Sequence, residues 1–255
     1  MIKPDLHIEL WNAFNDINFN EPDHKYTDSL GTEYQSATGW IRQFEPETNW
    51  DEIKLKKAKK DGVTVEELTK LWDYKSNYAT HLGTNCHSVM EFLWQKKNYN
   101  FDTSLNEQFP EMEEDFNFRK SRCHELYKKM KKIYIPIAQE FIVYDQPNGI
   151  CGTIDMLAYN QIKNCYSIID WKTSRKFDVS NFKGETLKAP FDHVEACNTS
   201  EYSLQLSLYK WILEKHTSIK IGEMILFQIP GKDVVMPQVF RCLDFSEQIG
   251  TLLTK

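Results

Sequence analysis

The sequence predicts an α/β protein in which a mostly helical N-terminal elaboration precedes a β-rich core. Up to about residue 135, apolar residues recur at helical spacing behind capping residues. After Pro136 the chain changes to short runs rich in Ile, Val, Tyr and Phe, which favour strands. With 255 residues, 41% of them hydrophobic, the chain can bury one substantial core. We therefore expect two parts, residues 1–135 and 136–255, folded as one compact unit.

The N-terminal part is expected to contain a hairpin followed by four helical segments. Residues 24–35 resemble a hairpin that turns at Leu30-Gly31. Thr64 and Glu67 form a capping box, in which each side chain bonds the backbone of the other residue at the start of a helix. The expected helical segments cover residues 36–44, 64–72, 84–94 and 111–132.

The β-rich part is expected to follow the order β-β-β-α-β-β. The expected strands cover residues 139–144, 150–158, 166–171, 224–229 and 234–241, and the helix covers residues 201–215. Pro230-Gly231-Lys232-Asp233 is a turn signal that joins the last two strands. This order predicts an α/β core that carries the helical part at its N-terminal side.

Charge and cysteine usage narrow the class of protein. The net charge is −6, yet positive charge gathers at Lys54–Lys60, Arg119–Lys132 and Lys172–Lys176, so a nucleic-acid partner stays open beside plain solvated helix faces. No stretch reaches the roughly 20 apolar residues of a membrane helix, and the N-terminus lacks a signal-peptide pattern. The six cysteines are scattered without a C-x-x-C pair, which predicts reduced, mostly buried thiols. We expect a cytoplasmic protein that does not bind membranes.

The residues with the clearest chemistry lie on two neighbouring predicted strands. In Ile168–Lys172 the two-residue period of a strand places Asp170 and Lys172 on one face. Asp155 lies across the hairpin from residues 168–170, at roughly 5–8 Å, so that both carboxylates could ligate one divalent cation. Oxygen ligands favour Mg²⁺ or Mn²⁺ over zinc. A plain salt bridge between Asp170 and Lys172 remains the alternative for this pattern taken alone.

Two further polar pairs share helix faces. Gln205 and Tyr209 are four residues apart on the predicted helix 201–215, where they could also be the mere boundary of its apolar stripe. His87 and Glu91 are one turn apart on an N-terminal helix. A single histidine is more often a packed or surface residue than a ligand, but His87 could supply a neutral nitrogen to a metal.

Taken together these residues resemble the PD-(D/E)XK nuclease superfamily, in particular its RecB-like branch of phage exonucleases, CRISPR-associated iron-sulfur nucleases and the mitochondrial genome-maintenance exonuclease. The matching motifs, in family order, are Gly83-Thr84-x-x-His87 with Glu91, Glu140, Gly152-x-x-Asp155, Asp170-Trp171-Lys172-Thr173-Ser174 and Gln205-x-x-x-Tyr209. His24-Lys25-Tyr26, Tyr34–Thr38 and Pro190–His193 look like segments of phage-encoded members. The resemblance spans nearly the whole chain and implies a restriction-endonuclease-like mixed central sheet flanked by helices.

The resemblance also implies roles for the site residues. His87, Asp155, Asp170 and the Trp171 carbonyl would bind the metal, Mg²⁺ or Mn²⁺. Lys172 would be the catalytic lysine, and Gln205 with Tyr209 would position the DNA backbone or that lysine. Glu91 and Glu140 are expected beside the ligands rather than on the metal. Only Cys242 lies near the C-terminus, so no iron-sulfur cluster is expected, and the chain has no Walker-type phosphate loop.

We accordingly expect a metal-dependent deoxyribonuclease, an exonuclease on single-stranded or end-processed DNA, with phage replication or recombination proteins as partners in the host cytoplasm. The alternatives are a structure-specific endonuclease, a catalytically silent DNA-binding subunit and an unrelated metal-dependent phosphoesterase. The expected DNA contacts come from the long loop after Thr173, which would form a flap, from the two lysine-rich helical segments at the rim, and from aromatic side chains available for stacking. These residues are Arg175, Lys176, Lys183 and Lys188 on the loop, and Trp72 and Tyr78 among the aromatics.

Overall fold

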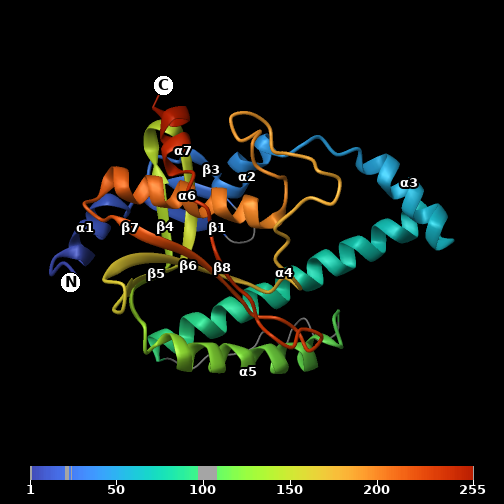
Figure 1. The fold of residues 1–255 in the computed structure, drawn as a ribbon, viewed down its shortest axis with the longest axis horizontal. Helices are drawn as coiled ribbons and strands as arrows, with labels where there is room; N and C mark the ends of the chain where they lie inside the picture. The colour runs from blue at the N-terminus through green and yellow to red at the C-terminus, as the bar shows by residue number, and fades with distance from the viewer. Residues whose placement is uncertain (1, 21–22, 24, 97–107, 255) are drawn as a thin grey trace.

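The computed structural model describes residues 2–20, 23, 25–96 and 108–254, and within them it shows a mixed sheet between two helical layers (Figure 1). The helices are α1 (Leu6–Ala13), α2 (Ala37–Ile41), α3 (Trp50–Asp61), α4 (Val65–Gln95), α5 (Met112–Met130), α6 (Asn198–His216) and α7 (Ser246–Leu253). The strands are β1 (Ile17–Asn20), β2 (Lys25–Asp28), β3 (Glu33–Ser36), β4 (Tyr134–Asp145), β5 (Ile150–Asn160), β6 (Cys165–Lys172), β7 (Ile221–Gln228) and β8 (Val239–Arg241). The predicted fold class is confirmed.

The sheet follows the order β1-β2-β3-β5-β6-β7-β8, and β4 pairs with the other edge of β5. The pairs β3–β5 and β6–β7 are parallel and the others are antiparallel. Two strands share one edge of β5: β3 pairs with Ile150 and Cys151, whereas β6 pairs with Met156 to Asn160. Residues 152–155 of β5 therefore lie in a fork between β3 and β6, and this fork contains Asp155.

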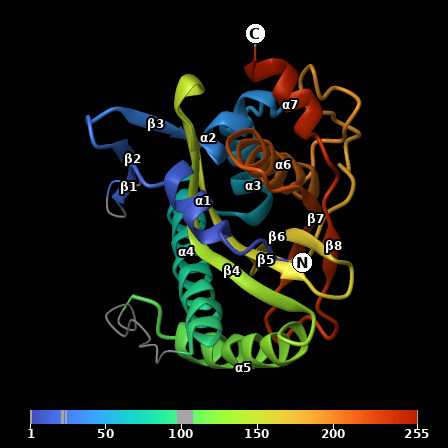
Figure 2. The same cartoon turned by 90° about the vertical axis from the view of Figure 1, so that its left-hand side faces the viewer.

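Each face of the sheet has its own apolar core. One core joins α1, α2, α6 and α7 to sheet residues such as Ile154 and Leu226. The other joins α4 and α5 to residues such as Met156 and Trp171. Figure 2 shows α4 and α5 on the opposite side of the sheet from α6 and α7. Neighbouring residues along β6, and along β5 after Met156, thus face different helical layers, as the strand period requires. Ile154 and Met156 are two residues apart but lie in different cores, so the alternation of β5 breaks at Asp155.

The helical segments predicted at residues 64–72 and 84–94 form one continuous helix, α4. It begins with the expected capping box of Thr64 and Glu67, and it continues through Gly83. A Cβ at Gly83 would lie 3.6 Å from Thr173 Oγ1, so the helix passes close to the end of β6 there. Together α3 and the first turns of α4 extend away from the sheet (Figure 1).

Several predicted boundaries differ from the structure. β4 begins at Tyr134, five residues before the expected start, because Pro136 is tolerated on an edge strand at a register shift. β8 covers only Val239–Arg241 instead of residues 234–241, since the Gln238 backbone N–H bonds the Gln228 side chain. The hairpin predicted at residues 24–35 is present as β2 and β3, although His24 lies outside the described residues. Helices α1 and α7 were not predicted.

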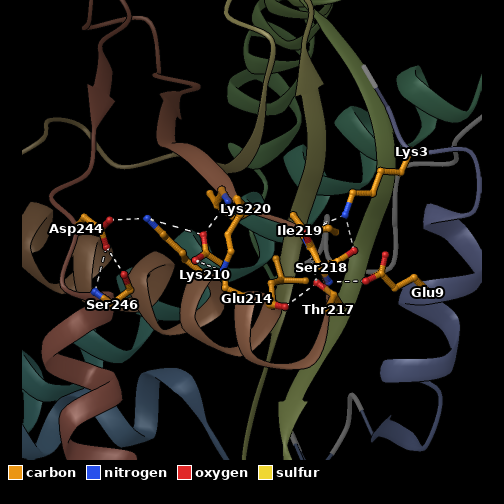
Figure 3. A network of polar contacts seen from close by, with 12 residues as sticks. Lys3, Glu9, Lys210, Glu214, Thr217, Ser218, Ile219, Lys220, Asp244 and Ser246 are labelled. Atoms are coloured by element: carbon orange, nitrogen blue, oxygen red, sulfur yellow. Dashed lines mark hydrogen bonds and ion pairs between the residues drawn. The ribbon is translucent and has the colours of Figure 1, made fainter.

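Polar contacts hold the two ends of the chain around α6 (Figure 3). The Lys3 ammonium donates to the Ser218 carbonyl at 3.0 Å, and Glu9 of α1 accepts from the Ser218 N–H. Near α7, the Lys210 ammonium donates to Asp244 at 2.5 Å. Among the described residues, no helix has the length and apolarity that would allow it to cross a membrane.

Candidate active site

Asp170 and Lys172 lie at the end of β6, in the middle of the sheet. The Lys172 ammonium lies 2.8 Å from Asp170 Oδ2, and the Asp170 side chain is 5% exposed. Ile169 and Trp171 face the opposite way, into the core under α4 and α5, as the strand period predicts. β7 pairs with β6 as far as Lys172, whereas the pairing with β5 ends at Ile169, so this pair is held by backbone on the β7 side and borders the fork on the other side.

The electrostatics of the pair keep the lysine charged. Burial alone would lower the pKa of Lys172, but the Asp170 and Asp155 carboxylates outweigh burial and raise it above its usual value. Burial and the neighbouring Asp155 raise the pKa of Asp170 to about 6, against the opposite effect of Lys172. Burial also raises the pKa of Asp155, despite the nearby charges of His87 and Lys172. Both carboxylates are therefore harder to ionise here than in water.

His87, Glu140 and Asp155 form a cluster beside that pair. His87 comes from α4, and its Nδ1 lies 3.4 Å from Asp155 Oδ2 and 3.9 Å from Glu140 Oε1. Its Nε2 lies 3.0 Å from the Trp171 carbonyl oxygen. Burial would lower the pKa of His87, but Asp155, Glu140 and Asp170 raise it to about 9. Each of the three residues offers a ligand atom within 4.8 Å of the others.

Glu140 reaches this cluster through an unusual backbone conformation. Its φ is +43°, in the left-handed region that non-glycine residues seldom adopt. It lies between the pairs Gln139–Met156 and Phe141–Ile154, which puts it opposite Asp155 in the β4–β5 register. Such a conformation costs on the order of 1–3 kcal/mol and persists where surrounding structure over-determines it. Glu140 was expected beside the ligands, whereas its carboxylate lies in the cluster with His87 and Asp155.

The donor set of this cluster fits a divalent cation. Two carboxylates and an imidazole, with the Trp171 carbonyl and Asp170 adjacent, are predominantly oxygen ligands, which suit Mg²⁺ or Mn²⁺. The raised pKa values of Asp155 and Asp170 agree with this, because a cation would stabilise their ionised forms. Asp170 stands apart from the three-residue group, as its carboxylate is paired with Lys172.

Gln205 and Tyr209 of α6 approach the site from the other helical layer. The Gln205 amide donates to the Tyr209 hydroxyl at 3.0 Å, and Tyr209 is 3% exposed. A Cβ at position 152 would lie 2.4 Å from the Tyr209 ring, so only glycine fits where β5 passes under it. The glycine of the Gly152-x-x-Asp155 motif is thus required by packing, because any larger side chain at position 152 would clash with Tyr209 at the fork that contains Asp155.

Tyr202 was not predicted from the sequence, and the expectation that Glu91 lies beside the ligands stays a prediction. The Lys172 ammonium lies 4.6 Å from the centre of the Tyr202 ring. The spacing of Tyr202, Gln205 and Tyr209 on one helix face is a signal that could have found it. Glu91 accepts from the Gln95 amide at 2.7 Å and is not part of the three-residue group.

The four loop cations expected to contact DNA are on the surface and paired with carboxylates. Arg175 bonds Asp233 at 2.7 Å with its side chain 81% exposed, and Lys176 bonds Asp178. Lys183 and Lys188 pair at longer distances with Glu185 (3.7 Å) and Glu47 (3.5 Å). Exposed pairs of this kind contribute little to stability, so all four cations remain available to phosphates.

The residues expected at the rim separate into two groups. The lysines of α3 are exposed, apart from the half-buried Lys54, and Trp50 packs edge-on against Trp72 with ring centres 6.4 Å apart. Arg119 is instead largely buried, and its guanidinium donates to the carbonyls of Thr173 (3.0 Å) and Ile229 (2.6 Å). Tyr78 donates to Asp115. Arg119 and Tyr78 therefore hold α5 and α4 to their neighbours.

Comparison with known families agrees with this geometry. The family model of the PD-(D/E)XK nuclease superfamily matches residues 63–250, well over half of the chain. The matched region contains His87, Glu140 and the Asp155, Asp170 and Lys172 set. No curated protein matches the sequence. With this fold and this match over most of its length, the chain belongs to the PD-(D/E)XK nuclease superfamily.

Proposed function

We propose that the protein is a Mg²⁺- or Mn²⁺-dependent deoxyribonuclease, and specifically an exonuclease on single-stranded or end-processed DNA. The observation that carries the proposal is the convergence of Asp155, Asp170 and Lys172 with His87 and Glu140 at the fork of β5. A binding-only protein has no physical need for a buried, charge-rich set of this kind.

The chain's own residues divide the work of hydrolysis. His87, Glu140 and Asp155 would hold the metal, and Asp170 and the Trp171 carbonyl next to them would complete its ligands. When bound, the metal supplies Lewis-acid stabilisation and a more acidic water. Lys172, kept charged by Asp170, faces the reacting phosphate and stabilises the negative charge that develops there. The attacking water gives up a proton to the solvent as its oxygen bonds to phosphorus, the phosphodiester P–O bond breaks, and the leaving oxygen takes up a proton from the solvent.

In this proposal, Gln205 and Tyr209 orient the DNA backbone at the site. Their mutual hydrogen bond and the close packing on Gly152 fix both side chains beside the fork. A fixed amide and hydroxyl can hold a backbone phosphate in line with the reacting groups, which lowers the entropic part of the barrier.

The exonuclease assignment rests on the segments around the site. α4 brings His87 from the N-terminal part of the chain to the sheet, and the loop after Lys172 lies beside the segment after α2 (Figure 1). The Lys188 backbone N–H donates to the Phe44 carbonyl at 2.6 Å, so this loop is attached at its far end. Segments that enclose the site from two sides favour a strand that threads by its end, with Arg175, Lys176, Lys183 and Lys188 contacting its phosphates.

The test compares closed circular single-stranded DNA with the same molecule linearised, at equal enzyme and early times. We expect degradation of the linear form only, dependent on Mg²⁺ or Mn²⁺ and abolished by EDTA. Strands labelled at the 5′ or 3′ end then give the polarity. Lys172→Ala is the control for contaminating nuclease. Equal cleavage of circles would favour the structure-specific endonuclease, and binding without cleavage of either form would favour the silent DNA-binding subunit.

We propose that the enzyme works in phage replication or recombination, in the host cytoplasm, beside other replication or recombination proteins. The support is the resemblance of Tyr34–Thr38 and Pro190–His193 to segments of phage-encoded nucleases. Deleting the gene from its phage should lower the recombination frequency, and a Lys172→Ala allele should fail to restore it. Restoration by that allele would contradict a catalytic role.

A further inference from the structure

A hollow of about 550 Å³ lies beside the candidate active site, between α2, the segment that follows it and the first turns of α6. This α2–α6 hollow is lined by Arg42, Glu45, Trp50, Glu201, Tyr202 and Gln205, among others. Its volume falls within the roughly 300–1,000 Å³ of small-molecule sites. None of its lining residues belongs to the carboxylate–histidine cluster.

Two residues connect the α2–α6 hollow with the catalytic residues. The Tyr202 ring forms part of its wall and lies 4.6 Å from the Lys172 ammonium. Gln205 also lines it and bonds the Tyr209 hydroxyl at 3.0 Å. A DNA strand whose reacting phosphate lies at Lys172 would therefore bring an adjacent nucleotide against Tyr202 and Gln205.

The charges of the hollow suit a base better than a phosphate. Glu45 and Glu201 contribute two carboxylates against the single guanidinium of Arg42. Burial and the neighbouring Glu45 raise the pKa of Glu201, which shows that its charge is poorly compensated. A phosphate here would meet net repulsion. Carboxylates accept hydrogen bonds from the exocyclic amino groups of bases, and arginine donates to ring acceptors.

The hollow also offers a stacking surface. Trp50 lies on its outer side and is 60% exposed, and its contact with Trp72 is edge-on. An indole face of this kind stacks on any base, so Trp50 can hold a base without choosing among them. Selection would come from Glu45, Glu201 and Arg42.

We propose that the α2–α6 hollow is a base-recognition subsite, which takes the base of a nucleotide next to the reacting phosphate and selects bases with an exocyclic amino group over thymine. The proposal rests on the proposed nuclease function. Cytosine offers its N4 amino group to the carboxylates, whereas thymine offers the O4 acceptor at the same place and would be repelled.

The first test measures binding without cleavage, by fluorescence anisotropy of oligo(dC) and oligo(dT) of equal length on the Lys172→Ala protein. We expect oligo(dC) to bind about fivefold or more tightly, the lower end of what one base contact provides. Adding Glu201→Gln or Glu45→Gln should bring the two affinities together, because an amide can also donate to thymine. Glu47→Gln is the matched control, as Glu47 is 94% exposed and outside the lining, and it should keep the ratio.

The second test maps cut positions of the wild-type enzyme on a mixed-sequence single strand. We expect thymine to be depleted at one fixed position next to the cut, and the Glu201→Gln enzyme to lose this depletion.

The outcomes separate the subsite from the nuclease function. If the wild-type enzyme cleaves without a base preference next to the cut, and oligo(dC) and oligo(dT) bind with equal affinity, the subsite proposal is wrong and the nuclease proposal is kept. The subsite proposal is also wrong if Glu201→Gln and Glu45→Gln leave the ratio of oligo(dC) to oligo(dT) affinity unchanged. If the wild-type protein shows the expected ratio of oligo(dC) to oligo(dT) affinity but cleaves no DNA, the nuclease proposal is wrong and base recognition in the hollow is supported. Circular dichroism checks that each variant is folded.

Discussion

Buried carboxylates far from the active site are fully supplied with hydrogen-bond donors. Asp145, at the end of β4, is 0% exposed and accepts from Lys215 and His216, both at 2.6 Å, and from Asn148. Burial would raise its pKa, but these donors hold the pKa below its usual value. Glu223 on β7 behaves in the same way, with its pKa lowered by Lys163 and two neutral donors. Both groups are stable as anions.

The carboxylates of the active site show the opposite balance. Asp155 and Asp170 share the Lys172 ammonium and His87, and their pKa values are raised. Burial alone therefore does not distinguish the carboxylates of the candidate active site in this protein. They differ in having fewer hydrogen-bond donors, and such a group is stabilised as an anion only when another cation is present.

Neutralising carboxylates of each kind should have opposite effects on cleavage and on stability. Asp155→Asn or Asp170→Asn should reduce cleavage to the detection limit and weaken Mn²⁺ binding, since each removes a ligand charge but little volume. The melting temperature of the metal-free protein should not fall, because like-charge repulsion is relieved. Cleavage assays, calorimetric Mn²⁺ titration and thermal unfolding measure the three quantities. Unchanged Mn²⁺ affinity in both variants would contradict the assignment of the ligands.

Lys172→Ala separates chemistry from binding. It should lower kcat by about 10²-fold or more, the usual loss when one group that stabilises the transition state is removed. Mn²⁺ affinity should be kept and DNA affinity should change little, as only one of many phosphate contacts is lost. Single-turnover cleavage with a parallel anisotropy titration gives both values. A variant that cleaves at nearly the wild-type rate would disprove a catalytic lysine.

Asp145→Asn should lower the stability of the fold, unlike Asp155→Asn and Asp170→Asn. The amide oxygen can still accept from Lys215 and His216, but the negative charge that faces them is removed, and we expect a loss of about 2 kcal/mol in the free energy of unfolding. Cleavage per folded molecule should match the wild type. Urea unfolding together with a cleavage assay tests both. A stability loss as small for Asp145→Asn as for Asp155→Asn would remove the distinction between the two kinds of carboxylate.

The smallest expected effect is a pH dependence of the stability loss that Asp145→Asn causes. The pKa of Asp145 is lowered in the folded state, so its contribution to stability is fully present above the unfolded value of about 4. The contribution is lost as the pH falls through the folded pKa. The difference in unfolding free energy between the wild type and Asp145→Asn should therefore narrow from pH 7 to pH 3. A constant difference over this range would show that Asp145 acts through packing rather than charge.

The sequence predicted those parts of the fold and site that depend on local pattern. Strand alternation placed Asp170 and Lys172 on one face, and the hairpin placed Asp155 beside them. Helical spacing paired Gln205 with Tyr209. Each of these relations follows from a period of two or of four residues, which is visible without tertiary contacts.

Relations that depend on tertiary structure were not predictable. The positive φ of Glu140 has no sequence signature, because any pattern of β-branched residues around it indicates a plain strand. The shortness of β8 depends on a Gln228 side chain ten residues earlier. The α2–α6 hollow joins Arg42 to Glu201, which are far apart in sequence. Periodicity carries no information on such pairs.

The fork in β5 has a consequence for how the enzyme folds. One branch, residues 165–172, follows β5 directly as a hairpin, whereas the other, residues 33–36, comes from far earlier in the chain, so the sheet around Asp155 is complete only after this distant segment has paired with β5. Contacts of such high sequence separation form slowly, because the entropy of closing long loops must be overcome first. The β3 branch of the fork is thus expected to form after the β5–β6 hairpin, and the cluster of His87, Glu140 and Asp155 is complete only once α4 has packed against the sheet.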